Sequence, residues 1–193
     1  MKIVVGIFAG GEGKRIGGRK PDRHLGGRTL LDRAVSLAQQ WSDEIVITVR
    51  DLLQVPNARC PVIADDPLIE GPLGGLASAL RFADALQFDA LLTIASDMPF
   101  LPADLAARLQ HGMTEAPVAI ARSDGHLHPV CALWRRETVV GLNDYIATGR
   151  TSLWGLAEQL GFTAVDWPSD PPDPFFNINS QQDLLAAERM IAR

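Results

Sequence analysis

Apolar residues follow two alternating patterns along this chain, one typical of buried strands and one typical of amphipathic helices. Continuous apolar runs favour strands that are covered on both faces of a sheet. They predict strands at residues 3–9, 45–49, 62–63, 90–95, 118–121, 129–134 and 162–167. Between these runs the apolar positions recur with helical spacing, as at i, i+3, i+4 and i+7 in residues 76–83. Helices are expected after a cap at Thr29, around residues 76–83, from Pro102 to about Gln110, and at residues 135–147, 151–160 and about 181–192.

The alternation of strands and helices predicts an α/β fold. Its expected form is a Rossmann-like three-layer sandwich, with a mostly parallel sheet between two layers of helices. No internal repeat or linker divides the sequence, so residues 1–193 are expected to form a single domain. Ligands of such folds bind beyond the carboxyl ends of the strands. Candidate functional residues are therefore expected directly after the predicted strands.

The composition narrows the classes of protein to which the chain can belong. Hydrophobic residues make up 47% of the 193 residues, and the formal net charge of −5 disfavours a protein that coats nucleic acid. Cys60 and Cys131 show no spacing typical of a disulfide framework or a zinc site. No apolar stretch approaches the roughly 20 residues of a membrane helix. Residues 3–9 are interpreted as a strand and not a signal peptide, and we expect a cytoplasmic protein without a membrane partner.

A glycine-rich, basic loop follows the first predicted strand. Six of the 18 basic residues lie between Lys14 and Arg28, and only Asp22 opposes them there. Glycines let backbone N–H groups approach a phosphate closely, so the loop favours an anion site over a solvated surface loop with incidental charge. Arg15 stands where a P-loop needs Ser or Thr, and Ile16 stands where a dinucleotide fingerprint needs Gly or Ala. A kinase, an ATPase or an NAD-dependent enzyme is thereby disfavoured.

The same loop resembles the signature of the nucleotidyltransferases that act on molybdopterin and related small phosphates. The matching residues are Ala9-Gly10-Gly11, Arg15-Ile16-Gly17-Gly18 and Lys20. The resemblance implies that residues 9–11 contact the nucleotide and that the loop wraps the triphosphate of an NTP. It also implies a catalytic role for Arg15 and Lys20, which would stabilise charge on the reacting phosphates. Arg19 stands where the molybdopterin enzymes usually carry Asp, and related cytidylyltransferases also lack that Asp, so the identity of the acceptor stays open.

Two further motifs in the first half of the chain resemble the same family. Asp65 to Gly75 resembles an Asp followed by Gly-Pro-Leu-Gly-Gly, which implies nucleotide contacts from Asp65 and Gly74; turn glycines at a helix start are the alternative. Asp97 directly follows an apolar strand, where a carboxylate projects into the ligand crevice. Because Mg²⁺ prefers one or two carboxylates together with substrate phosphates, Asp97 is the candidate metal ligand. Its Asp-Met-Pro motif resembles the metal site of the family.

The candidate acceptor residues lie in the second half of the chain. His128 precedes Pro129 in a segment that resembles the His-Pro strand of the family, near the acceptor. His126 would share a strand face with His128, but two ligands without a third are weak support for a metal site. Asn177 and Asn179 resemble an Asn-x-Asn motif of the family, and such amides suit the polar edges of a pterin. Capping of the last helix is the alternative role for these two residues.

These motifs run in the order of the family from Ala9 to Leu184. The resemblance implies transfer of GMP from GTP to molybdopterin, with or without molybdenum, with Mg²⁺ as cofactor and pyrophosphate as by-product. It also implies a nucleotide-binding part in about residues 1–100, an acceptor-binding part in about residues 101–193, and transient contact with proteins of cofactor biosynthesis or molybdoenzyme maturation. The alternatives are a cytidylyltransferase, a transferase for another phosphorylated metabolite, and a non-catalytic nucleotide- or cofactor-binding protein.

The implied reaction needs no protein nucleophile. A terminal phosphate has a second pKa of about 6 and is largely dianionic at neutral pH, so it can attack the α-phosphate without a general base. We therefore expect the protein to position the two substrates and to neutralise charge.

Overall fold

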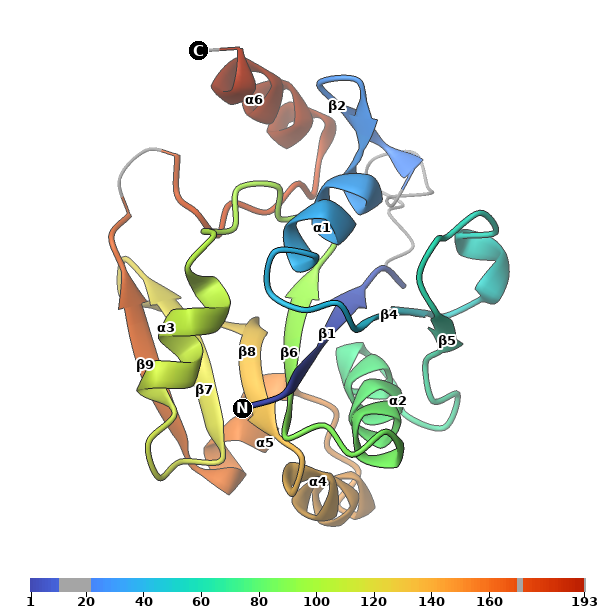
Figure 1. Ribbon diagram of the computed structural model, residues 1–193, viewed down its shortest axis with the longest axis vertical. Coiled ribbons are helices and arrows are strands. Elements are labelled where there is room, and N and C mark those ends of the chain that lie inside the picture. The colour runs from blue at the N-terminus through green and yellow to red at the C-terminus, as the bar shows by residue number, and fades with distance from the viewer. Residues whose placement is uncertain (11–21, 170–171, 193) are drawn as a thin grey trace.

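A computed structural model of the protein describes residues 1–10, 22–169 and 172–192 (Figure 1). Within these residues, seven strands form one sheet in the order β5-β4-β1-β6-β8-β7-β9. The strands are β1 (Ile3–Phe8), β4 (Ile45–Val49), β5 (Val62–Ala64), β6 (Ala90–Ala95), β7 (Val118–Ser123), β8 (His126–Arg135) and β9 (Phe162–Trp167). The pairs that β8 makes with β6 and β7 are antiparallel, and the other pairs are parallel. The predicted mostly parallel sheet is confirmed.

Helices cover both faces of the sheet. On one face lie α1 (Leu30–Ala38) and α3 (Leu105–Gly112), and on the other lie α2 (Pro72–Ala85), α4 (Thr138–Ala147) and α5 (Leu153–Leu160) (Figure 1). Because side chains alternate along a strand, β1 serves two apolar cores: Val5 and Ile7 pack in the core of α1 and α3, and Val4 packs in the core of α2. This arrangement confirms the predicted three-layer α/β sandwich.

The last helix, α6 (Gln181–Ile191), packs away from the sheet against a small hairpin of β2 (His24–Leu25) and β3 (Arg28–Thr29). The sequence pattern predicts only a loop here. The hairpin turns at Gly26, whose φ of +56° suits glycine. A Cβ on Gly26 would also lie 2.5 Å from Cδ1 of Ile191, so a side chain here would require the end of the Ile191 side chain to shift. Of the helices described, none is long and apolar enough to span a lipid bilayer.

Local hydrogen bonds explain where the helices start. Thr29 caps α1 as predicted, since its hydroxyl oxygen accepts a backbone N–H bond at 3.0 Å. α3 begins at Leu105 and not at Pro102, because a turn precedes it in which the Leu105 N–H donates to the Pro102 oxygen at 3.0 Å. α2 begins at Pro72, a residue that suits the first helical turn because no intrahelical partner is lost there. A short 3-10 helix at Leu52–Gln54 is an element that the sequence pattern does not predict.

β7 and β8 form a tight hairpin at the carboxyl end of β7. Its turn residues, Asp124 and Gly125, have φ angles of +47° and +73°, as the favoured two-residue hairpin turns require. The antiparallel strand β8 therefore begins at His126, earlier than the predicted residue 129.

A bulge interrupts the pairing of this hairpin. Ile120 on β7 pairs with Ala132 on β8, yet the next residue, Ala121, pairs with His128. Pro129 lies inside the bulge, where its missing N–H removes no ladder bond. The extra residues, 129–131, are released from the ladder with β7.

Candidate active site

A cavity of about 270 Å³ opens where β1, β4 and β6 end. β1 lies between β4 and β6, at the switch point of the sheet where open α/β folds bind ligands. The predicted Ala9, Gly10, Asp65 and Asp97 all line this cavity. The remaining wall is formed by Phe8, Thr48, Arg50, Gly71, Pro72, Gly75, Ala95, Ser96 and Val130.

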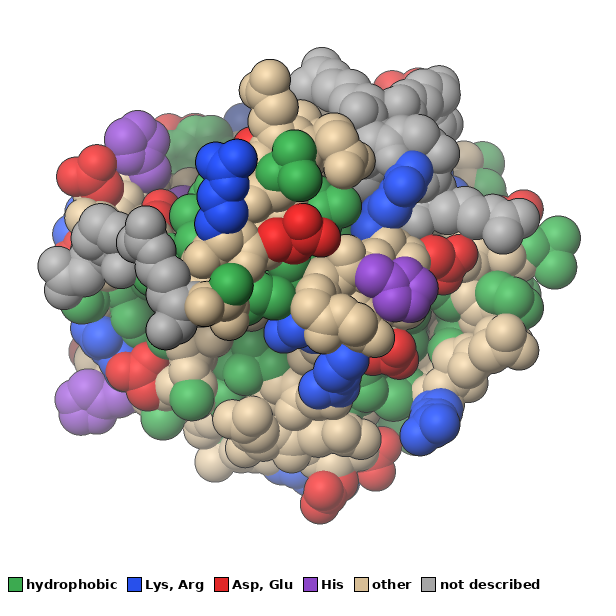
Figure 2. All heavy atoms as spheres, turned by 90° about the horizontal axis from the view of Figure 1, so that it is seen from above, with side chains coloured by type: hydrophobic (Ala, Val, Ile, Leu, Met, Phe, Trp, Pro, Cys, Tyr) green, Lys and Arg blue, Asp and Glu red, His purple; other side chains and the backbone are tan. Residues whose placement is uncertain are grey.

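Figure 2 looks onto the carboxyl edge of the sheet. Among the described side chains on this face, Lys and Arg alternate with Asp and Glu and do not gather in one broad patch.

Asp65 follows β5 and supplies a buried acceptor at the cavity. Its own N–H donates to the Val49 oxygen at 2.7 Å. Its Oδ1 is buried and has no hydrogen-bond partner of good geometry among the described residues. Burial raises the pKa of the Asp65 carboxyl group, while the Arg50 guanidinium and the Thr48 hydroxyl oppose the rise. Because an unsatisfied buried acceptor costs free energy, the position suits a donor on a ligand.

Two glycines bring backbone against the Asp65 carboxylate. A Cβ on Gly10 would lie 2.9 Å from Asp65 Oδ2, and a Cβ on Gly75 would lie 3.1 Å from Oδ1 and 2.9 Å from Thr48 Oγ1. The predicted Gly74 is placed differently, because its Cβ would meet a backbone oxygen of the preceding loop at 2.7 Å. Gly74 thus lets the start of α2 pack against that loop, and Gly75 lines the cavity.

Asp97 follows β6 and is 7% exposed on the cavity wall. Its segment is fixed on two sides: the Ser96 N–H donates to the Phe8 oxygen at 3.1 Å, and the Asp97 oxygen accepts from the Ile178 N–H at 3.0 Å. In the part of the chain that the structure describes, no three His, Cys, Asp or Glu side chains gather as a metal site. One carboxylate beside a cavity fits Mg²⁺, which completes its shell with substrate phosphate and water.

Three predicted residues of the phosphate loop, Gly11, Arg15 and Lys20, lie outside the described residues. The described chain leads directly into that loop from the cavity wall. Ala9 is buried, and its N–H donates to the Thr48 oxygen at 2.9 Å.

The predicted acceptor residue His128 lies on β8 next to the bulge, where it pairs with Ala121. Its ring stacks on Phe175, with ring centroids 4.5 Å apart and planes inclined by 12°. Its Nε2 lies 2.8 Å from the hydroxyl oxygen of Ser123, which donates to Asp173 Oδ1 at 3.1 Å. Burial lowers the pKa of His128 against the opposing charge of Asp173, and the neighbouring His126 lowers it further.

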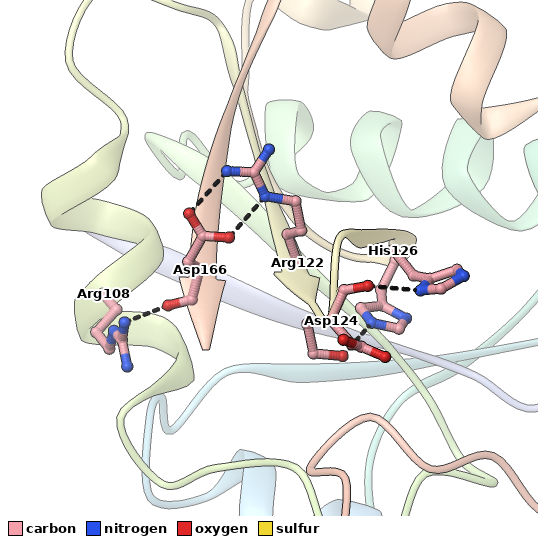
Figure 3. A network of polar contacts seen from close by, with 7 residues as sticks. Arg108, Arg122, Asp124, His126 and Asp166 are labelled. Carbon is pink, nitrogen blue, oxygen red and sulfur yellow. Dashed lines mark hydrogen bonds and ion pairs between the residues drawn. The ribbon is translucent and has the colours of Figure 1, made fainter. Parts of the chain in front are cut away.

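Figure 3 shows how the outer edge of this hairpin is held. Arg122 on β7 donates twice to the carboxylate of Asp166 on β9, at 2.6 and 2.7 Å. Arg108 on α3 donates to the backbone oxygen of Asp166. Nδ1 of His126 lies 2.9 Å from the Asp124 oxygen in the turn. These contacts tie β7 to β9 and α3, so the hairpin that carries His128 is anchored on its outer side.

The predicted pair Asn177 and Asn179 is divided between two surroundings. Asn177 Oδ1 is buried and has no hydrogen-bond partner among the described residues. Asn179 is exposed, and its N–H donates to Asp183 Oδ2 at 2.9 Å within the cap of α6. The alternative role in capping is therefore present for the backbone of Asn179. Asn177 adjoins the Asp97 segment, because the next residue, Ile178, donates to the Asp97 oxygen.

Several groups at this edge were missed by sequence reasoning. Thr48 and Arg50 lie at the end of β4, so the rule that ligands bind after strands could have found them. Ser123 precedes an Asp-Gly pair, which is a strong hairpin signal, and that signal could have placed Ser123 near the start of β8. Asp173 carries no comparable local signal, because its bond to Ser123 depends on how the chain packs.

Comparison with known sequences gives a consistent result. A family model described as MobA-like NTP transferase domain matches residues 5–164. A molybdenum cofactor guanylyltransferase from Cereibacter sphaeroides is 34% identical over 195 residues, which cover 100% of this chain and 99% of that protein. One of the same name from Acidiphilium cryptum is 37% identical over 186 residues, which cover 94% and 92%.

Comparison with solved structures shows the same fold. Molybdopterin-guanine dinucleotide biosynthesis protein A from Archaeoglobus fulgidus has a TM-score of 0.79 and 24% identity, with 98% of each chain covered. The 4-diphosphocytidyl-2C-methyl-D-erythritolsynthase from Anaerococcus prevotii has a TM-score of 0.77 and 15% identity, with 100% of this chain and 96% of that chain covered. The fold is thus shared by proteins with different substrates in their names, so the fold alone does not identify the substrate.

Proposed function

The chain belongs to the MobA-like NTP transferase family, and on that premise we propose that it transfers GMP from GTP to molybdopterin, with or without molybdenum, and releases pyrophosphate. It is a nucleotidyltransferase, and a relative named molybdenum cofactor guanylyltransferase aligns with its whole length. The class of enzyme follows from these comparisons, and the identity of the two substrates is what we propose.

The observation that carries the choice of GTP is the unsatisfied carboxylate oxygen of Asp65 next to Arg50. Guanine presents two neighbouring donors, N1–H and the exocyclic amino group, beside the O6 acceptor. An ionised carboxylate only accepts and a guanidinium only donates, so Asp65 suits the two donors and Arg50 suits O6. Adenine and cytosine have a lone pair at the ring nitrogen where guanine has N1–H, and that lone pair would face the carboxylate unfavourably.

The rest of the cavity suits the triphosphate. The start of α2 directs backbone N–H groups and the positive end of its dipole toward anions. We assign nucleotide contacts to residues 9–11 and Gly74, and neutralisation of the reacting phosphates to Arg15 and Lys20. Asp97 would hold Mg²⁺, which supplies positive charge against the phosphate oxygens.

The proposed step balances without a protein base. The terminal phosphate of the acceptor is largely dianionic at neutral pH. One of its oxygens attacks the α-phosphorus of GTP, the bond from that phosphorus to the oxygen bridging to the β-phosphorus breaks, and pyrophosphate leaves. The protein holds the two phosphates in line and offsets their charge.

We place the acceptor against His128, Asn177 and Asn179, so that one domain has a donor part in about residues 1–100 and an acceptor part in about residues 101–193. The backbone bond between Asp97 and Ile178 supports this arrangement, since it holds the asparagine segment beside the candidate metal ligand. We also propose that the reaction takes place in the cytoplasm, with transient contact to proteins that supply or receive the cofactor. The unpaired state of Cys60 and Cys131 is consistent with a reducing compartment.

Thermal unfolding with GTP, CTP, ATP or UTP, each with Mg²⁺, tests the donor. A ligand at 100 times its Kd stabilises a protein by about 2.7 kcal/mol, which is readily measured. GTP is expected to raise the Tm most. An equal or larger shift with CTP would assign a cytidylyl donor, and no shift with any of the four would remove the proposed donor site.

A further inference from the structure

Three side chains from separate segments form a hydrogen-bonded chain beside the proposed acceptor site. Ser123 ends β7, His128 borders the bulge of β8, and Asp173 belongs to the loop before α6. The Ser123 hydroxyl is 2.8 Å from His128 Nε2 and 3.1 Å from Asp173 Oδ1. Ser123 is 2% exposed, so water competes little for these bonds.

The chemistry of the three groups sets the direction of both bonds. An ionised carboxylate only accepts, so the single hydroxyl proton of Ser123 is donated to Asp173. The serine oxygen then has only lone pairs left for the histidine, and the bond to Nε2 requires a proton on that nitrogen. A neutral His128 is thereby held as the Nε2–H tautomer, with an unshared electron pair on Nδ1.

The position of the His128 ring is fixed as well as its tautomer. Phe175 stacks on it, and Trp167 packs edge-on against Phe175 with centroids 5.5 Å apart. Asp173 Oδ1 also accepts the N–H of Phe175 at 2.9 Å, so one carboxylate oxygen anchors both the hydrogen-bonded chain and the stacking partner. Nδ1 has no hydrogen bond within the described residues and is not among their fully buried polar atoms.

We infer that Ser123 and Asp173 are positioning residues. They hold His128 so that its Nδ1 accepts a hydrogen bond from an N–H group at the edge of a flat heterocyclic ring, and this ring belongs to the substrate that receives GMP. The inference rests on the proposed function, because it deepens the acceptor site. Asn177 Oδ1, in the same loop as Asp173, is a second acceptor atom with no partner among the described residues. A ring with N–H donors, as on a pterin, is the chemical class that such atoms recognise.

The assignment gives acceptor binding a characteristic dependence on pH. Protonation of His128 would turn Nδ1 from an acceptor into a donor, so the acceptor KM should rise as the pH falls through the pKa of the ring. The titratable groups that act on this ring are Asp173, which favours the charged form, and His126, which disfavours it. Removing the charge of Asp173 should therefore move the rise in KM to a lower pH.

The experiment compares Ser123→Ala, Asp173→Asn, His128→Ala and the double variant Ser123→Ala/His128→Ala with the wild type. Acceptor KM, kcat and GTP Kd are measured between about pH 5 and pH 8. Ser42→Ala is the matched control. It also removes a serine hydrogen bond, of 2.8 Å to the Ile3 oxygen, but at the amino end of β1 and away from the carboxyl ends of the strands. The tautomer of His128 is read separately, from the ring ¹⁵N chemical shifts of the protein without substrates.

Ser123→Ala should raise the acceptor KM roughly threefold to tenfold with an unchanged GTP Kd. It should add nothing further in the His128→Ala background, because the serine acts only through the histidine. Asp173→Asn keeps an oxygen for the Ser123 and Phe175 bonds, so it should shift the KM profile to lower pH without a loss of Tm. The wild-type ring should show the Nε2–H tautomer, and Ser123→Ala should show a mixture of tautomers.

An Nδ1–H tautomer in the wild type, or independent effects of Ser123→Ala and His128→Ala on KM, would overturn the inference while leaving guanylyl transfer intact. Failure of the proposed function looks different: the wild type would release no pyrophosphate from GTP with the pterin acceptor, and the assignment of Nδ1 to that acceptor would be lost with it.

Discussion

The donor side and the acceptor side of this protein are built in different ways. The donor side, the cavity around Asp65 and Asp97, lies at the ends of parallel strands, and Gly10 and Gly75 bring backbone close to the Asp65 carboxylate there. The acceptor side, around His128, is formed by side chains from three segments that meet only in the folded chain. A backbone hydrogen bond from Ile178 to Asp97 holds the asparagine segment of the acceptor side against the donor side.

This difference separates what the fold provides from what side chains specify. Strand ends where glycines let backbone approach a ligand suit the triphosphate, which is common to all NTP donors. A network of side chains can be altered one group at a time without moving a strand. We therefore expect changes on the donor side to affect turnover or nucleotide binding strongly, and changes on the acceptor side to act selectively on the acceptor KM.

The largest effect is expected for Asp97→Asn. The substitution keeps the size of the side chain but removes the charge that would hold Mg²⁺, so kcat should fall on the order of a hundredfold or more. Circular dichroism and the Tm should show an intact fold. Asp144→Asn, at an exposed position on α4, is the matched control and should leave kcat unchanged. Near-normal turnover of Asp97→Asn at saturating Mg²⁺ would end the metal assignment.

Asp65→Asn should weaken GTP binding by roughly tenfold to a hundredfold, because the amide cannot accept both guanine donors as a carboxylate does. The free energy of unfolding of the protein without GTP, in contrast, should not decrease in this variant at neutral pH. Burial raises the pKa of Asp65, so the ionised group destabilises the folded protein at neutral pH, and stability is regained as the pH falls through that pKa. The variant without ligand should melt at or above the wild type at pH 7, and the gap should close in acid.

Asp66→Asn provides the matched comparison for this second prediction. Asp66 pairs with Arg81 at 2.6 Å, and that bond lowers the pKa of its carboxyl group. Its ionised form therefore stabilises the fold at neutral pH, and this contribution is lost as the pH falls through the lowered pKa. A slightly lower Tm with unchanged nucleotide preference is expected. If both variants changed the nucleotide preference equally, Asp65 would have no special role in base recognition.

The smallest of these effects is expected on the acceptor side. Asn177→Ala removes a buried oxygen that has no partner among the described residues, so it should raise the acceptor KM about twofold to tenfold at unchanged GTP affinity and Tm. Asn179→Ala should have a weaker effect, since Asn179 is exposed and its backbone serves the cap of α6. Steady-state kinetics in both substrates, with melting curves, make the comparison. A selective KM defect in Asn179→Ala alone would reverse the two assignments.

The same difference explains what could be predicted from the sequence. Asp65, Asp97 and Gly10 belong to contiguous motifs that directly follow strands, so a pattern along the chain was enough to group them, and the structure places them in one cavity. The apolar runs likewise predicted the layers of the fold, because burial on both faces of a parallel sheet leaves a continuous apolar signal.

The acceptor network left less of a signal: His128 belongs to a contiguous His-Pro motif, but its contacts with Ser123 and Asp173 follow from no pattern along the chain. Ser123, His128 and Asp173 come together through a turn, a bulge and a long loop, none of which shows a periodic pattern. The hairpin of β2 and β3 escaped prediction for a related reason: its apolar residue Leu25 is buried against the distant α6, and two-residue strands are too short to show alternation. Contacts between segments far apart in the sequence are decided by packing, which a local pattern does not record.

Guanylyl transfer itself is tested most directly with GTP labelled at the α-phosphate. The wild-type protein is incubated with Mg²⁺ and molybdopterin, and the label in the pterin product is measured together with the pyrophosphate released. We expect the label to enter the pterin product in equal amount to the pyrophosphate, and CTP labelled in the same way to give far less. Binding of GTP without transfer of label, or faster transfer from CTP, would contradict the proposed function.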